Sequence, residues 1–190
     1  MGAILFVLLQ AKRVRKEIPI YAEKIGAIVP EDVSCEEFLL PFSSFALMKK
    51  RRGGSTGRRV IYPSDFGDVY LFFYQYSSAP RGAPAGSLSC DTVLVCNETF
   101  GLSNCFVSNS GLKRLAKKAV GIESENERLE SLLKGKRRCN LEVSDAGIMM
   151  YFNAYIYPPS AMAELIFEFL DLLQEIKDLP YVDGELRTSN

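Results

Sequence analysis

The order of apolar and polar positions along the chain predicts strands and helices that do not alternate regularly. The clearest strand covers residues 68–76 (DVYLFFYQY), which are rich in aromatic and β-branched side chains. Further strands are expected at residues 42–48, 88–97 and 104–108, and a hairpin at 137–144 and 147–157. Because the strands come mainly as hairpins, the pattern favours an antiparallel sheet.

The strongest helical pattern lies near the C-terminus, from Ala161 to Leu179. Apolar side chains recur there at i, i+3, i+4 and i+7, with Ser160 as an expected cap and Pro180 as a stop. Other helices are expected at residues 3–25, 31–40, 111–120 and 123–133. The chain is therefore predicted to be α+β, with a mainly antiparallel sheet and amphipathic helices packed on one face.

The length of the chain and the absence of a linker favour one domain. A chain of 190 residues can bury a core of its own. We expect an apolar then basic N-terminal helix over residues 1–25, a single α+β domain over 26–180 and a flexible tail over 181–190.

The N-terminus combines an apolar run with positive charge. Residues 1–9 (MGAILFVLL) are nearly all apolar, and Lys12, Arg13, Arg15 and Lys16 follow. This order is typical of a segment that meets the cytoplasmic side of a membrane, but a hydrocarbon core needs about 20 residues. The segment is a shallow interfacial anchor, the remnant of a longer spanning segment, or a helix packed on protein. We expect a cytoplasmic protein, and such an anchor would hold it at the inner face of the membrane.

Composition argues against an enzyme. The chain has no His, which removes the usual general base and the imidazole metal ligands. No catalytic, metal-binding or nucleotide-binding motif takes its place, so we expect no catalytic residue, cofactor or metal.

The five cysteines are spread along the chain without a C-x-x-C pair. This spacing fits reduced, buried thiols. Cys96 and Cys105 could still face each other across a hairpin, which leaves one disulfide open.

Two predicted strands each carry a tyrosine-rich face. Period-two alternation places six tyrosines on these faces: Tyr70, Tyr74, Tyr76, Tyr151, Tyr155 and Tyr157. The opposite, apolar faces should lie under helices, so the tyrosines should face outward. Among the functional interpretations, a protein interface is favoured over base stacking. The alternatives are cross-strand aromatic pairing and cover by the N-terminal helix.

A basic segment is the second candidate site. Residues 49–59 (KKRRGGSTGRR) hold six cations around three glycines, namely Lys49, Lys50, Arg51, Arg52, Arg58 and Arg59. The segment is predicted to be a flexible hairpin loop. Such a loop is either solvated or binds an anionic lipid or nucleic acid. Charge is uneven along the chain: residues 1–118 hold 16 Lys/Arg and 10 Asp/Glu, and residues 119–190 hold 7 and 13.

Several short motifs follow one another in a recognisable order. They are Pro41-Phe42, Gly53 with Arg58 and Arg59, the strand around Phe73–Tyr76, Thr92-Val93, a basic helix, and the hairpin and helix from Glu142 to Ile176. In this order the chain resembles, over about residues 11–178, an uncharacterised bacterial family with a membrane helix before a small α+β domain. No activity is established for that family, so the resemblance implies no site residues. The apolar segment of this chain is shorter than a membrane helix.

Taken together, these features predict a non-enzymatic interaction or accessory module, held at a membrane or within a larger assembly by its N-terminus. A protein partner is expected on the tyrosine face. The alternative is binding of anionic lipid or nucleic acid through residues 12–16 and 49–59, with nucleic acid the less favoured ligand. The sequence does not indicate whether a small-molecule ligand binds.

Overall fold

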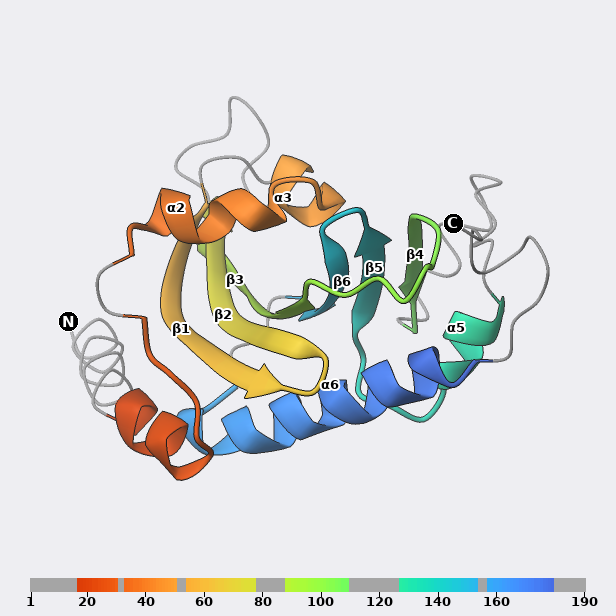
Figure 1. Ribbon diagram of the computed structural model, residues 1–190. Coiled ribbons are helices and arrows are strands. Elements are labelled where there is room, and N and C mark those ends of the chain that lie inside the picture. Colours follow the sequence, from red (N-terminus) through yellow and green to blue (C-terminus); the bar gives the residue numbers. More distant parts are fainter. Residues whose placement is uncertain are drawn as a thin grey trace.

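The computed structural model describes residues 17–30, 33–50, 54–77, 88–109, 127–153 and 157–179. These residues form a six-stranded antiparallel sheet in the order β1-β2-β3-β6-β5-β4 (Figure 1). The strands are β1 Ser55–Ser64, β2 Gly67–Ser77, β3 Leu88–Cys96, β4 Cys105–Ser108, β5 Asn140–Ser144 and β6 Gly147–Phe152. The predicted α+β class and the antiparallel sheet are confirmed.

Among the helices with both ends in the described residues, only the last one is long. They are α2 Cys35–Leu39, α3 Ala46–Lys50, α5 Glu127–Leu132 and α6 Met162–Lys177, with 3-10 turns η1 Leu40–Phe42 and η2 Pro159–Ala161. Residues 17–24 are also helical. Ser160 lies inside η2, and the N-cap position of α6 is Ala161 without a side-chain hydrogen bond, so the predicted Ser160 cap is wrong. Within the described ranges, no helix is both long and apolar enough to cross a membrane.

One face of the sheet shares a hydrophobic cluster with α6. The buried side chains of α6 belong to the same cluster as Leu71, Leu94 and Met150 of the central strands. The apolar side chains of this cluster recur about every 3.6 residues along α6 and every 2 residues along the strands. Figure 1 shows α6 running across the strands on this side.

The opposite face has a second cluster beneath the segment from α2 to α3. Phe38, Phe42 and Phe45 of this segment pack with Phe72 and Val95 of the sheet. Helices therefore lie on both faces, and the prediction that they lie on one face is wrong (Figure 1). The three phenylalanines are spaced by four and three residues, which places them on one side of helical turns.

The segment expected to be a strand at residues 42–48 instead contains the end of η1, a turn and the start of α3. Pro41 lies in η1, where its fixed φ suits the start of a helix. The buried carboxylate of Glu142 accepts hydrogen bonds from the backbone N–H groups of Ala46 and Leu47, the latter at 3.3 Å. A carboxylate from β5 thus satisfies the first donors of α3.

The outer edge of β1 is covered by the chain that precedes α2. Ile28 forms a two-hydrogen-bond bridge with Ile61, at 2.7 and 2.8 Å. Arg59 Nη1 donates to the carbonyl oxygens of Val33 at 2.6 Å and Ser34 at 3.2 Å. The bridge uses the backbone N–H and C=O of Ile61, which an open edge strand would offer to another chain.

Candidate functional site

The tyrosine face lies in the second core and not at the surface. Tyr74, Tyr76 and Tyr151 are 2%, 8% and 5% exposed, so the prediction that this face looks outward is wrong for them. The predicted alternation itself is correct, because Tyr70, Tyr74 and Tyr76 share a cluster that excludes Leu71 and Phe73. These tyrosines are buried because the α2–α3 segment covers the face. The alternation of side chains within one strand cannot predict such a contact, because it joins segments that are distant in the sequence.

Tyr70 and the remaining tyrosines have different surroundings. Tyr70 is half-buried, with its ring centroid 5.0 Å from that of Phe42. Burial, followed by the charge of Asp68, raises the pKa of the Tyr70 hydroxyl. Tyr155 lies outside the described residues. Tyr157 is half-buried and packs against the first core, whereas Tyr70, Tyr74, Tyr76 and Tyr151 belong to the second.

Polar groups on the tyrosine face are used by the fold. Tyr76 Oη donates to Asp91 Oδ1 at 3.2 Å, and both residues are buried. Farther along the same face, Ser108 Oγ donates to Asn140 Oδ1 at 2.9 Å, and Asn140 Nδ2 donates to the carbonyl of Tyr151 at 3.3 Å. These bonds satisfy buried polar atoms between the strands, as a stable interior requires.

Only part of the basic segment lies within the described residues, and residues 55–59 belong to strand β1. Arg58 and Arg59 lie in β1 at a bulge, where Arg58 has a φ of 54°, so the prediction of a flexible loop is wrong for residues 55–59. Both guanidinium groups lie over aromatic rings, Arg58 5.2 Å from Phe73 and Arg59 5.2 Å from Phe38. Such contacts stabilise the fold.

The other predicted cations divide between helix α3 and undescribed residues. Lys49 is exposed on α3, and Lys50 is the last residue of that helix. The rest lie outside the described residues, namely Arg51, Arg52, Lys12, Arg13, Arg15 and Lys16.

The five thiols are free, so Cys96 and Cys105 are not bridged. Burial, then the charge of Asp91, raises the pKa of Cys90 to about 11. Burial, then the charge of Glu168, raises the pKa of Cys139 to about 12. Both thiols are therefore protonated near neutral pH and poor nucleophiles.

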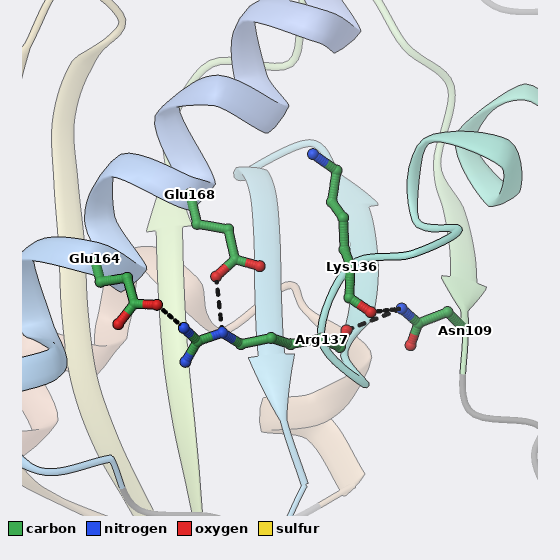
Figure 2. A network of polar contacts seen from close by, with 5 residues as sticks. All are labelled: Asn109, Lys136, Arg137, Glu164 and Glu168. Carbon is green, nitrogen blue, oxygen red and sulfur yellow. Dashed lines mark hydrogen bonds and ion pairs between the residues drawn. The ribbon is translucent and has the colours of Figure 1, made fainter.

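A different polar network lies at the turn between α5 and β5, where the sequence pattern predicted no site. Asn109 follows β4 and holds this turn with its side-chain amide (Figure 2). Its Nδ2 donates to the carbonyls of Leu133 at 2.9 Å, Lys136 at 3.3 Å and Arg137 at 2.9 Å. Its Oδ1 accepts from the backbone N–H of Cys139 at 2.8 Å. One side chain thus fixes both ends of the turn.

Arg137 connects this turn to α6. Its Nε lies 3.2 Å from Glu168 Oε2, and its Nη2 forms an ion pair with Glu164 (Figure 2). The guanidinium carbon lies 5.3 Å from the ring centroid of Tyr157. A hydrogen bond with Tyr157 and the charges of the two carboxylates raise the pKa of Arg137. Tyr157, predicted as an interface residue, therefore lies beside this ion-pair network.

The other cations of the turn border a small cleft of about 250 Å³. We call residues Lys134–Arg138 the basic turn. The cleft is lined by Ser108, Asn109, Glu130, Leu133, Lys134, Gly135, Lys136 and Arg138. Lys136 Nζ lies 3.1 Å from Glu175 Oε1 of α6. Lys134 and Arg138 are exposed, and no carboxylate of the described residues forms an ion pair with either.

This geometry suits binding of an anion. The described lining residues of the cleft include three cations and one carboxylate, and none of them is His, Cys or Tyr. Among the described residues, no group of three or more His, Cys, Asp or Glu side chains is arranged to hold a metal ion. The sequence signal that could have located the site is the run KGKRR, with four cations around one glycine.

Comparison of the chain with protein-family models, with curated proteins and with solved structures finds no match. The resemblance noted from the sequence therefore stays an expectation, and the candidate site is supported by its geometry alone.

Proposed function

We propose that the protein is a non-enzymatic interaction module that binds an anionic partner at the basic turn. The observation that carries this proposal is the cleft beside Asn109, where the exposed cations Lys134 and Arg138 lie on a turn held by four hydrogen bonds. A turn fixed before binding loses little conformational entropy when the partner arrives. Two exposed cations would also steer an anionic partner toward the cleft.

The basic turn supports an interaction role better than the tyrosine face does. Tyr74, Tyr76 and Tyr151 would have to lose their cover before a partner could reach them. The alternative anion site at residues 49–59 is weaker for a similar reason, since Arg59 is hydrogen-bonded to Val33 and Ser34. Lys49 remains an exposed cation for that alternative.

The N-terminal segment completes the proposal. We infer that the apolar residues 1–9 and the cations Lys12–Lys16 hold the module at the inner face of a membrane or within a larger assembly, as the residue pattern suggests. In this view, residues 1–16 localise the protein and the basic turn recognises its partner.

Charge reversal tests the proposal. The variant Lys134→Glu with Arg138→Glu is compared with Lys24→Glu with Lys49→Glu, which changes the net charge equally at two other exposed positions. Each full-length protein is tagged in the native host, purified in mild detergent and compared by the proteins that co-purify. We expect the partner to be lost from the first variant only, and its recovery from wild type to fall as salt rises.

The same experiment can refute the proposal. If the basic-turn variant retains the partner, the proposal is wrong. Loss of the partner from the other variant would then place binding around Lys49, in the alternative basic segment 49–59. Thermal unfolding of both variants shows whether each is folded, and exposed substitutions of this kind usually change stability little.

A further inference from the structure

The four cations of the basic turn have two roles: one forms ion pairs with α6, and three line the cleft. Arg137 is directed to Glu164 and Glu168 of α6, which removes it from the cleft (Figure 2). Lys134, Lys136 and Arg138 line the cleft, and Glu130 is the one acidic residue among the lining residues that the structure describes. These described residues together have a formal charge of +2, which matches a doubly charged anion.

The types of side chain suit a phosphate group. An arginine guanidinium can donate two parallel hydrogen bonds to phosphate oxygens, and a lysine adds a compact positive charge. Arg138 and Lys134 provide this combination. Lys136 can contribute when it leaves Glu175, whose side chain is 44% exposed and can be solvated. Asn109 shapes the cleft, because its amide is already bonded to the turn.

The surroundings of the cleft favour a single anionic group over a long polyanion. Helix α6 carries four acidic residues, Glu164, Glu168, Asp171 and Glu175, and one Lys. Three of these acids bond to the basic turn, so an extended polyanion would meet like charge beside the cleft. Proteins that bind nucleic acid strongly present wide basic surfaces. The cleft volume of about 250 Å³ also lies below the range of roughly 300–1,000 Å³ for drug-sized ligands.

We propose that the cleft binds one phosphate-class dianion through Arg138 and Lys134, with Lys136 shared between the ligand and Glu175. This inference rests on the proposed function and names the chemistry of the group recognised. The dianion comes either from free phosphate or from a phosphorylated side chain of the partner. Both sources present the same three phosphate oxygens.

Titration calorimetry on the full-length protein tests this inference with four probes at constant ionic strength. They are inorganic phosphate, a phosphoserine peptide with neutral flanking residues, the same peptide without phosphate, and a single-stranded oligonucleotide. We expect saturable binding of the first two probes. Affinity should fall about tenfold or more in Lys134→Gln with Arg138→Gln, because charge-assisted hydrogen bonds are lost. It should be unchanged in Lys24→Gln with Lys49→Gln. Binding of the phosphopeptide should weaken from pH 7.5 to pH 5, since the second pKa of a phosphate monoester is about 6.

The outcomes separate the two sources and the two proposals. Equal affinity for both phosphate probes indicates a free-anion site, and tighter binding of the phosphopeptide indicates a phosphorylated partner. The inference is overturned if phosphate does not saturate, if the oligonucleotide binds as tightly, or if the basic-turn variant keeps wild-type affinity. If co-purification depends on the basic turn but phosphate does not bind, the proposed function stands and this inference fails. If phosphate binds but co-purification is independent of the turn, the proposed function fails alone.

Discussion

At the scale of single residues, Asn109 shows how one side chain can organise a site that is distant in sequence. It follows β4, yet it bonds to Leu133, Lys136, Arg137 and Cys139. The side-chain amide has two protons and three carbonyl acceptors, so one proton is shared between two oxygens. The bond to Lys136, at 3.3 Å, is the longest of the three. Gly135, with a φ of 81°, provides the left-handed residue that the turn between these carbonyls requires.

We therefore predict that Asn109→Ala destabilises the fold by about 1–3 kcal/mol, the usual cost of leaving partly buried polar groups unsatisfied. Asn109→Asp should cost more than Asn109→Ala, because a carboxylate would face three carbonyl oxygens. Urea unfolding of the three proteins measures the difference. An Asn109→Asp protein as stable as wild type would show that these bonds do not hold the turn.

Cys139 should make stability depend on pH in the alkaline range. Burial raises its pKa from 9.0 to about 12, so the folded protein holds the thiol proton more tightly than the unfolded chain. The resulting stabilisation is complete below pH 9 and is lost as pH rises from about 9 toward 12. Over that window the loss from this group approaches about 1.4 kcal/mol per pH unit.

Cys139→Ala isolates this contribution. Unfolding free energies of wild type and the variant at pH 7, 9 and 10 should converge above pH 9, because only wild type loses stability through this thiol. Other titrating groups affect both proteins alike. Parallel curves would mean that the thiol does not change its pKa on folding.

At the scale of elements, the segment from α2 to α3 forms a layer of its own, although its helices are only five residues long. Ser34 accepts a hydrogen bond from the N–H of Glu37 at the start of α2. At the start of α3, the acceptor is the carboxylate of Glu142, which lies in strand β5. Helices this short are not stable alone. Their stability must come from the phenylalanines that they bury against the sheet.

Phe42→Ala should therefore cost about 3–5 kcal/mol, the range for a fully buried phenylalanine. Phe42 has no exposed surface, stacks on Phe72 at 5.7 Å between ring centroids and meets Phe38 edge-on at 5.9 Å. Leu40→Ala in the same 3-10 turn is the control, since Leu40 is 70% exposed. Its expected cost is below about 0.5 kcal/mol. Chemical denaturation of both variants compares them, and similar costs would contradict a second core.

The elements that could be predicted are those in which apolar side chains recur with the period of a strand or of a helix. Strand β2, strand β3, the β5–β6 hairpin and helix α6 were each expected within a few residues, because alternation or helical spacing is continuous there. Strand β1 was missed because its first half has the composition of a basic, glycine-rich loop. The start of α3, where a strand was expected, is bonded to Glu142, about 95 positions away. The basic turn likewise depends on Asn109, which lies 24–28 positions before the residues whose carbonyls it bonds.

At the scale of the whole molecule, the sheet consists of two halves that meet at one strand pair. Strands β1, β2 and β3 form one half, and β6, β5 and β4 form the other. The β3–β6 pairing runs from Thr92 opposite Phe152 to Cys96 opposite Ile148. It closes the longest loop in the sheet, so it has the highest entropic cost of formation. Both hydrophobic clusters cross this pair, which couples the two halves.

Gly147 lies where this junction meets the β5–β6 turn, and it has a φ of 125°. A Cβ on this residue would overlap the carbonyl oxygen of Cys96 and lie 2.7 Å from the Cα of Asn97. Both atoms are backbone of the β3 end, so neither can move without shifting the strand. Gly67, the first residue of β2, has a φ of 84°, and among the described residues no heavy atom beyond its chain neighbours lies within 4 Å of the position that a Cβ would take there. It is therefore a control for a glycine of positive φ at the same place in a hairpin but without a close backbone contact.

We predict that Gly67→Ala costs about 1–2 kcal/mol, which is the penalty of a left-handed conformation for a residue with a Cβ. Gly147→Ala should cost roughly 1–3 kcal/mol more, because the new methyl group must also displace the end of β3. Hydrogen exchange should then show faster opening of β3 and β6 in Gly147→Ala, while in Gly67→Ala the change stays near the β1–β2 turn. Equal stability losses with equal exchange patterns would mean that the two halves of the sheet do not depend on close approach at this glycine.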